Sequence, residues 1–137
     1  MSKVKGSRAE RELFHLLWDT QEWAVVRSAG SGSTQKPSPD LIASNGTKTL
    51  ALECKAIKDK KKYFNAEELN QLNEFATTFG AEPWLAVRFD NEGWFFVPLA
   101  EVPKSKGKHF VLTFDFAKKK GLAFKELIGE FKQERLV

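Results

Sequence analysis

The stretch PDLIASNGTKTLALECK, residues 39–55, decides the fold that this sequence can adopt. Two mainly apolar runs flank the Asn-Gly pair at 45–46, and such a pair is the strongest short-range signal for a tight turn between antiparallel strands. Three charged residues, Asp40, Glu53 and Lys55, interrupt these runs. Because burying a charge is costly unless a partner compensates it, these residues predict a functional site on the sheet.

The turn also predicts how the charged residues are arranged. A two-residue turn at 45–46 would place Asp40 opposite Ala51. Side chains alternate along a strand, so Ala51, Glu53 and Lys55 would share one face of the sheet, and Asp40 would join them. Asp40 and Glu53 would then be diagonal neighbours whose carboxylates can converge on one point. Mg²⁺ prefers hard oxygen ligands, so this arrangement predicts a magnesium site with Lys55 beside it.

A first helix is predicted over residues 7–20, SRAERELFHLLWDT. Ser7 is a good N-cap and Glu10 stands three residues on, as in a capping box, while apolar residues recur at helical spacing. Glu10 also lies at the end of the apolar stripe that faces the sheet. Two roles for Glu10 therefore stay open, completion of the capping box with Ser7 and action at the charged site, and one carboxylate can serve both.

The rest of the chain alternates between strand and helix patterns. Asn65 and Gly80 bound a second amphipathic helix as its cap and its stop, and Gly, Ser and Pro mark residues 30–39 as a loop. Further strands are expected at residues 23–29, 83–89, 93–99 and, more weakly, 109–114, and a last helix is expected at 122–136. The order predicts an α/β fold, with a central mixed β-sheet flanked by helices, in a single domain spanning residues 1–137.

The composition indicates a globular protein without membrane segments. Hydrophobic residues make up 42% of the chain and charged residues 29%, and no apolar run approaches the roughly 20 residues of a membrane span. The basic N-terminus lacks the apolar segment of a secretory signal, so a cytoplasmic, nucleoid-associated protein is expected. The single cysteine, Cys54, excludes an intrachain disulfide and is predicted to be a small core side chain.

The basic residues favour a polyanionic partner. The net charge of +4 and the pI near 9.2 are modest, but the lysines and arginines are clustered, with further lysines at 104–108 and 118–120. The DNA-binding candidates are Lys3, Lys5, Arg8, Arg11, Arg27, Ser33, Lys58, Lys60, Lys61 and Lys62. The loop SAGSGSTQK lacks the spacing of a Walker phosphate loop, so no nucleotide cofactor is expected.

The charged residues of the hairpin also belong to a known pattern. Pro39-Asp40 followed by Glu53-Cys54-Lys55 resembles the PD-(D/E)xK nuclease motif. The segments KGSRAERELFHLLW, WAVVRSAGSGS, PDLIASNG, ALECKA and EFATTFGAEPWLAVRF are similar, in order and spacing, to the archaeal Holliday junction resolvases of that superfamily. The resemblance runs from the N-terminus to the GWFFVPL strand and implies a restriction-endonuclease-like nuclease fold.

The resemblance implies a role for each matching residue. It assigns catalysis to Glu10, Asp40, Glu53 and Lys55, and metal binding to the three carboxylates among them. Ser31 matches a loop serine that acts in part of the family. On the second helix these enzymes commonly carry a glutamine near the site, whereas this chain has Glu68 there and Gln71 one turn further along, so both are treated as accessory residues.

The function implied is that of a structure-selective endodeoxyribonuclease that resolves four-way DNA junctions by paired symmetric nicks. The resemblance further implies Mg²⁺ as cofactor, with Mn²⁺ able to substitute, and a homodimer, because a two-fold dimer can deliver two symmetric cuts. The segments 2–6, as a mobile arm, and 28–38 are expected to read junction shape. The aromatic residues Trp84, Trp94, Phe95 and Phe96 could form either the dimer patch or the monomer core.

Alternatives to junction resolution remain open at this point. The nearest is a PD-(D/E)xK nuclease that cuts other branched or linear DNA. A different class is a DNA-binding protein on the same scaffold that no longer cleaves, although every core position of the motif is filled. A basic RNA-binding module ranks last, because most aromatic residues lie in apolar strands or helical stripes rather than among the basic ones.

Overall fold

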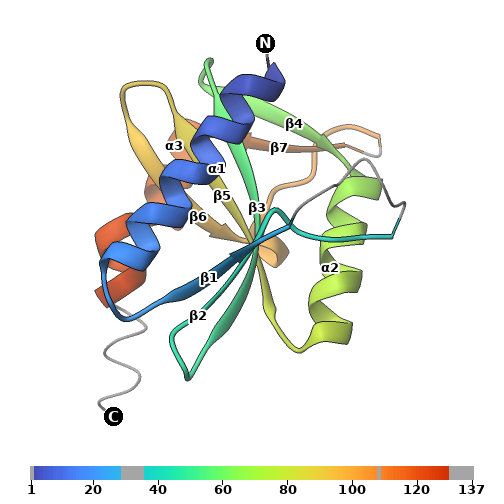
Figure 1. The fold of residues 1–137 in the computed structure, drawn as a ribbon. Helices are drawn as coiled ribbons and strands as arrows, with labels where there is room; N and C mark the ends of the chain where they lie inside the picture. The colour runs from blue at the N-terminus through green and yellow to red at the C-terminus, as the bar shows by residue number, and fades with distance from the viewer. Residues whose placement is uncertain (1, 29–35, 108, 130–137) are drawn as a thin grey trace.

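The computed structural model describes residues 2–28, 36–107 and 109–129 (Figure 1). The elements are α1 (Ser2–Asp19), β1 (Ala24–Arg27), β2 (Leu41–Ser44), β3 (Thr49–Ile57), β4 (Lys61–Asn65), α2 (Ala66–Phe79), β5 (Glu82–Phe89), β6 (Gly93–Pro98), a 3-10 turn η1 (Leu99–Glu101), β7 (His109–Thr113), α3 (Phe114–Lys120) and β8 (Leu122–Ala123). Within the described ranges, no helix is long and apolar enough to cross a membrane.

The predicted α/β fold with a mixed sheet is confirmed. The central sheet has six strands in the order β1-β2-β3-β5-β6-β8, and β3 pairs with β5 in parallel while the other neighbours are antiparallel. A parallel pair needs a crossover connection, and the segment containing β4 and α2 provides it. A separate pair, β4 and β7, forms a small second sheet.

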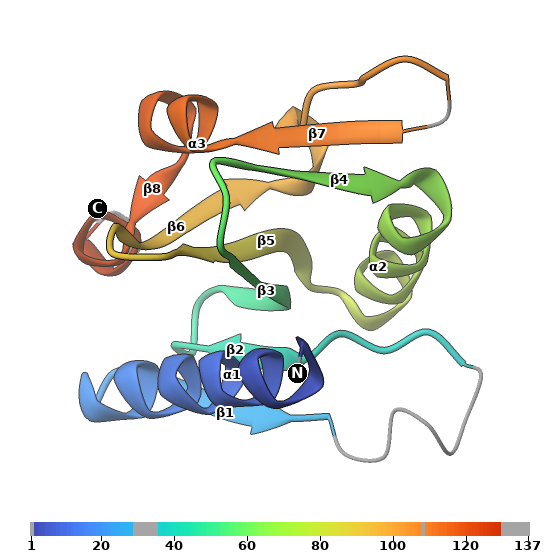
Figure 2. The same ribbon diagram turned by 90° about the horizontal axis from the view of Figure 1, so that it is seen from above.

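Helix α1 covers one face of the central sheet, and α2, α3 and the small sheet cover the other (Figure 2). On one face, Leu13 and Leu17 of α1 pack with Leu41, Leu52 and neighbouring residues in one apolar cluster. On the other face, residues of α2, β4, β7 and α3 form a second cluster against β3 and β5. Each fully buried leucine contributes about 1.5–3 kcal/mol relative to an exposed one. The sheet is therefore held from both sides.

Helix α1 begins earlier than the sequence predicts. It starts at Ser2, so Ser7 lies inside the helix and cannot be its N-cap, and the capping-box role of Glu10 is wrong. The segment 2–6, expected to be a mobile arm, is helical as well. A glycine such as Gly6 costs only about 1 kcal/mol within a helix, so one glycine does not stop the hydrogen-bond ladder from extending.

The register of the hairpin also differs from the prediction. Ser44 pairs with Thr49 rather than Thr47, and Leu41 pairs with Leu52. The side chain of Asn45 accounts for the wider turn, because its Oδ1 accepts hydrogen bonds from the main-chain N–H groups of Thr47 at 2.9 Å and Lys48 at 2.8 Å. The register moves by two residues, and since side chains repeat with a period of two, each residue keeps its predicted face.

The strand β4, the helix α3 and the short elements η1 and β8 were not predicted. The lysine-rich residues 61–65 form β4, and the segment expected as a strand near 109–114 pairs with it rather than with the central sheet. Lysine is common on exposed edge strands, where it hinders aggregation. A lysine run lacks the apolar alternation that typically indicates a strand, so the sequence pattern did not predict β4. Helix α3 was also missed. The expected last helix begins at residue 124, after the edge strand β8, and its part beyond residue 129 lies outside the described residues.

Candidate active site

Asp40 is fixed beside Glu53 by two hydrogen bonds to the neighbouring strand. Its main-chain N–H donates to the carbonyl of Leu52 at 3.0 Å, and its Oδ2 accepts from the N–H of Cys54 at 2.8 Å. Leu52 and Cys54 are the residues before and after Glu53. Asp40 does not stand opposite Ala51, as the predicted register required, because Ala51 pairs with Ile42. The expected closeness of Asp40 and Glu53 is nevertheless found.

The carboxylates of Asp40 and Glu53 lie together in a poorly solvated site. Burial raises the pKa of Asp40 to about 6, with a further contribution from the charge of Glu10 and an opposing one from the Cys54 hydrogen bond. Burial and the charge of Asp40 raise the pKa of Glu53 to about 8. Two like charges held together out of water disfavour full ionisation. A cation bound between them would relieve both effects.

Lys55 supplies positive charge at the same site. Its Nζ lies 3.8 Å from Oε2 of Glu53 and 3.5 Å from Oε1 of Glu68, which projects from the first turn of α2. Burial lowers the pKa of Lys55, but the charges of Glu53, Glu68 and Asp40 outweigh burial and raise it. The ammonium is therefore charged at neutral pH and held between a strand and a helix.

Glu10 approaches the pair from α1. Its Oε1 accepts a hydrogen bond from Nε of Arg27 at 2.9 Å, and its charge acts on Asp40 and Glu53. Across the described residues, no three His, Cys, Asp or Glu side chains are gathered closely enough to hold a metal ion. Asp40 and Glu53 still fit Mg²⁺, which keeps several waters and usually takes one or two carboxylates from the protein.

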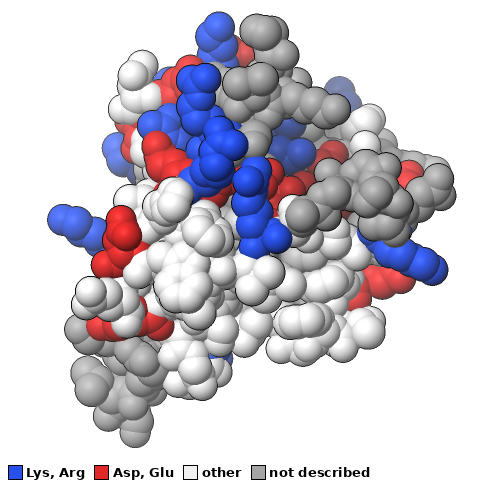
Figure 3. Space-filling view, viewed as in Figure 1, with Lys and Arg blue, Asp and Glu red and all other residues white. Residues whose placement is uncertain are grey.

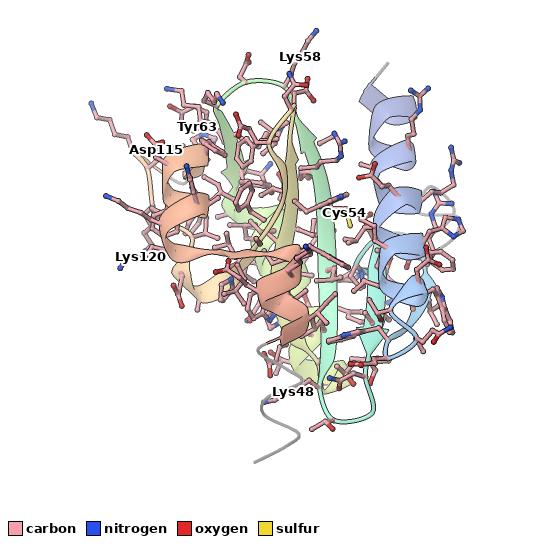
Figure 4. The ribbon with its side chains drawn as sticks, turned by 90° about the vertical axis from the view of Figure 1, so that its left-hand side faces the viewer. Lys48, Cys54, Lys58, Tyr63, Asp115 and Lys120 are labelled. Carbon is pink, nitrogen blue, oxygen red and sulfur yellow. The ribbon has the colours of Figure 1, made fainter. Side chains whose placement is uncertain are left out.

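The remaining predicted residues fall into several groups. Arg8, Arg11, Lys58, Lys60, Lys61 and Lys62 are exposed. Gln71 is exposed on α2, one turn beyond Glu68. Ser31 and Ser33 lie outside the described residues, as do the side chains of Lys3 and Lys5. Cys54 is buried beneath α1 (Figure 4), and burial raises the pKa of its thiol, so it stays protonated in the core as expected.

Arg88 near the C-terminal end of β5 was not among the predicted residues. It lines a surface hollow of about 270 Å³ together with Arg8, Ala9, Glu12 and Ala56. Glu12 Oε1 accepts from Arg88 Nε at 2.8 Å and from the indole of Trp94 at 2.6 Å. A lone arginine in the apolar strand PWLAVRF was the available signal, but only the pairing of Arg88 with Ala56 places it beside β3, against α1.

The four aromatic residues that were expected either in a dimer patch or in the monomer core lie in the core. Trp84, Trp94 and Phe96 are buried and Phe95 is partly buried, so all four belong to the monomer core rather than to a dimer patch. Among the described residues, the exposed large apolar side chains are those of Val26 at 65%, Phe79 at 56%, Tyr63 at 51% and Trp18 at 44%. Phe79 stacks on Phe75, with ring centroids 5.1 Å apart.

Charged and uncharged residues separate on the surface shown in Figure 3. Lys and Arg gather over its upper part, around the N-terminal half of α1, with acidic residues among them. Uncharged residues cover most of its lower part, where β1, β2 and the C-terminal half of α2 lie. This face therefore presents a basic region and an uncharged region side by side.

Known proteins match this chain over nearly its whole length. The profile of a family described as archaeal Holliday junction resolvase (Hjc) matches residues 1–136. The crossover junction endodeoxyribonuclease Hjc of Archaeoglobus fulgidus is 38% identical over 133 residues, which cover 97% of this chain and 96% of the relative. The enzyme of the same name from Methanocaldococcus jannaschii is 37% identical over 132 residues, which cover 96% and 92%.

A solved structure agrees with these sequence matches. The structure of the Archaeoglobus fulgidus Hjc, titled as a Holliday junction resolvase from an archaeal hyperthermophile, superposes with a TM-score of 0.81 at 35% identity. The match covers 91% of this chain and 96% of that one. The fold described above is therefore that of the restriction-endonuclease-like resolvases.

Proposed function

This chain belongs to the archaeal Holliday junction resolvase family, and on that premise we propose that it is an endodeoxyribonuclease that resolves four-way DNA junctions by paired symmetric nicks. The observation that carries the proposal is the Asp40–Glu53 pair with the Lys55 ammonium beside it. Paired carboxylates can hold the metal ion of metal-assisted phosphodiester hydrolysis, and a lysine can stabilise the charge that develops on the phosphate. The substrate would be chromosomal DNA, so we expect the protein at the nucleoid.

Family membership implies dependence on a divalent metal in general terms, and we propose Mg²⁺, with Mn²⁺ able to substitute. Asp40 and Glu53 would hold the ion, and the Glu10 carboxylate on α1 would contribute to binding it. The ion, when bound, would neutralise the scissile phosphate and polarise its bonds toward attack by water. The raised pKa values of both carboxylates support this choice, since a metal ion bound between them would favour their ionised forms.

Lys55 would act directly on the substrate. An ammonium is a compact positive charge, and one placed beside the metal-binding carboxylates can stabilise the negative charge that develops on the phosphate. The strand β3 carries both Glu53 and Lys55, so the two groups are held at a constant spacing by the sheet. Asp40 is held by its two main-chain hydrogen bonds to the same strand.

The basic residues would bind the DNA backbone. Arg8 and Arg88 border one hollow next to the strand that carries Lys55, and lysines 58 and 60–62 follow directly after β3. Contacts from such residues to phosphates give affinity without reading base sequence. Binding should therefore depend little on DNA sequence and fall steeply as salt concentration rises.

The exposed apolar residues suggest how a homodimer would form. Val26 pairs with Ile42 on the face of β1 and β2 that α1 leaves uncovered, and Phe75 and Phe79 stack on α2. A patch of exposed apolar residues of this kind typically marks an interface. A two-fold dimer built on it would present two identical sites to the two strands that must be cut.

The test compares a labelled synthetic four-way junction with a linear duplex of the same sequence, each incubated with Mg²⁺ or with chelator. Paired symmetric nicks in the junction alone, and only with metal, are expected. Equal cutting of both substrates would retain the nuclease and remove the junction specificity. Tight binding without cutting under Mg²⁺ or Mn²⁺ would instead indicate a DNA-binding protein on a nuclease scaffold.

A further inference from the structure

Glu68 occupies a special position on α2, the third residue of the helix. The N-cap Asn65 accepts a hydrogen bond from the main-chain N–H of Glu68 at 2.8 Å, which fixes where the first turn begins. The Glu68 side chain is about one-third exposed, and its Oε1 lies 3.5 Å from Nζ of Lys55. The cap therefore sets the position from which Glu68 reaches across to β3.

Lys55 has two carboxylate partners in the structure, and they differ in availability during catalysis. Glu53 lies at 3.8 Å and Glu68 at 3.5 Å. Under the proposed function, Glu53 also binds the metal ion, which competes with Lys55 for its oxygens. Glu68 comes from another element and would stay with Lys55 when the metal is bound. A lysine side chain is long and flexible, so a second, independent partner restricts where its ammonium can lie.

We propose that Glu68 is a positioning residue that holds the Lys55 ammonium at the active site from α2. This inference rests on the proposed role of Lys55 in the reaction. It predicts that Glu68 affects the rate of the chemical step through Lys55 alone, rather than by binding metal or DNA. The carboxylate charge is what matters, because an amide at this position could accept a hydrogen bond but would attract the ammonium less.

Glu67 provides a matched control. It is also acidic, lies in the same first turn of α2 and is exposed, but no ion pair links it to Lys55. Glu67→Gln and Glu68→Gln change the net charge and the charge near the helix N-terminus equally. Only Glu68→Gln removes the charge that faces Lys55, so a difference between the two variants reports on that contact.

The experiment measures single-turnover cleavage of a four-way junction at saturating protein, with Mg²⁺, for Glu68→Gln, Glu67→Gln, Lys55→Gln and the double variant Lys55→Gln/Glu68→Gln. Glu68→Gln should slow cleavage by about five- to ten-fold, and Glu67→Gln by less than about two-fold. The double variant should cleave no more slowly than Lys55→Gln alone, because the two residues act as one unit.

Metal binding distinguishes positioning from a role at the metal ion. Calorimetric titration with Mn²⁺ should give Glu68→Gln the same affinity as Glu67→Gln, and thermal melting should show both folded. If Glu68→Gln slows the Lys55→Gln background by its full factor, or weakens Mn²⁺ binding, Glu68 acts on the metal and the inference is wrong. Equal cleavage rates for Glu68→Gln and Glu67→Gln would also overturn the inference. If Lys55→Gln itself cleaves normally, the proposed catalytic role of Lys55 fails first, which is a separate result.

Discussion

Asp40 bonds to both main-chain neighbours of Glu53, donating to Leu52 and accepting from Cys54. The two carboxylates are thus held together by the backbone of β3 rather than by their own side-chain flexibility. Because like charges in a buried place repel each other, the arrangement is unfavourable by itself and becomes favourable when a cation joins it.

Neutralising either carboxylate should abolish cleavage while leaving DNA binding largely intact. Asp40→Asn or Glu53→Gln removes a ligand of the proposed metal site, and the rate should fall about a thousand-fold or more. Junction affinity should stay the same or increase, since a negative charge near the DNA is lost. Gel-shift titration and single-turnover cleavage measure the two effects, with Glu74→Gln on the exposed face of α2 as control. A normal rate for Asp40→Asn would rule out the assignment.

The stability of the metal-free protein should fall as pH rises through the neutral range. The pKa of Glu53 is raised in the folded state from 4.5 to about 8, and that of Asp40 from 3.8 to about 6. A raised folded-state pKa means that the folded state binds more protons than the unfolded state, so its contribution is full below about pH 4 and is lost as pH approaches 8.

Thermal melting in EDTA between pH 5 and pH 8 measures this dependence. The melting temperature should decline over that range, and Mg²⁺ should raise it at pH 8, where both carboxylates are ionised. Glu53→Gln should flatten the profile because the main titrating group is gone, whereas Glu74→Gln should not. A wild-type profile that stays flat or rises in EDTA would show that the pair is better solvated than its burial indicates.

Removing both arginines of the hollow should weaken junction binding. Arg8→Ala combined with Arg88→Ala deletes two cations next to the strand that carries the active site. The slope of log affinity against log salt should become shallower by about 0.9 for each lost phosphate contact. Lys48→Ala is the control. Lys58 directly follows β3 at its C-terminal end, and Lys48 lies at the opposite end of the molecule from Lys58 (Figure 4). Equal losses per charge removed in the two variants would indicate a diffuse charge effect rather than a binding site.

An acidic residue in the exposed apolar region should dissociate the proposed dimer. Phe79→Glu would place a charge in a buried interface, where it has no partner. Sedimentation should then show a monomer, and junction cleavage should lose its paired nicks. Tyr63→Glu provides the matched control, since Tyr63 is 51% exposed and Phe79 is 56% exposed. If Phe79→Glu sediments like the wild type, the interface lies elsewhere or the protein acts as a monomer.

The sequence alone predicts which residues share a face of the sheet. Side chains alternate along strands and repeat along helices, so Asp40, Glu53 and Lys55 were assigned to one face correctly even though the hairpin register was wrong by two residues. The second helix was predicted with its ends, because Asn65 caps it and Gly80, at φ 89°, ends it through local interactions.

Contacts between distant elements were decided by the tertiary structure. The Asn45 side chain widens the turn, and β7 pairs with β4 rather than with the central sheet. Trp84 is buried in the core, whereas Phe79 is exposed. Likewise, no local sequence pattern predicts that Glu68 lies near Lys55 or that Arg88 lies near Arg8. Periodicity is a property of single segments, whereas these contacts depend on how segments pack against one another. The sequence by itself therefore determined the elements, the charged face and the family pattern, and packing determined the neighbours that complete the site.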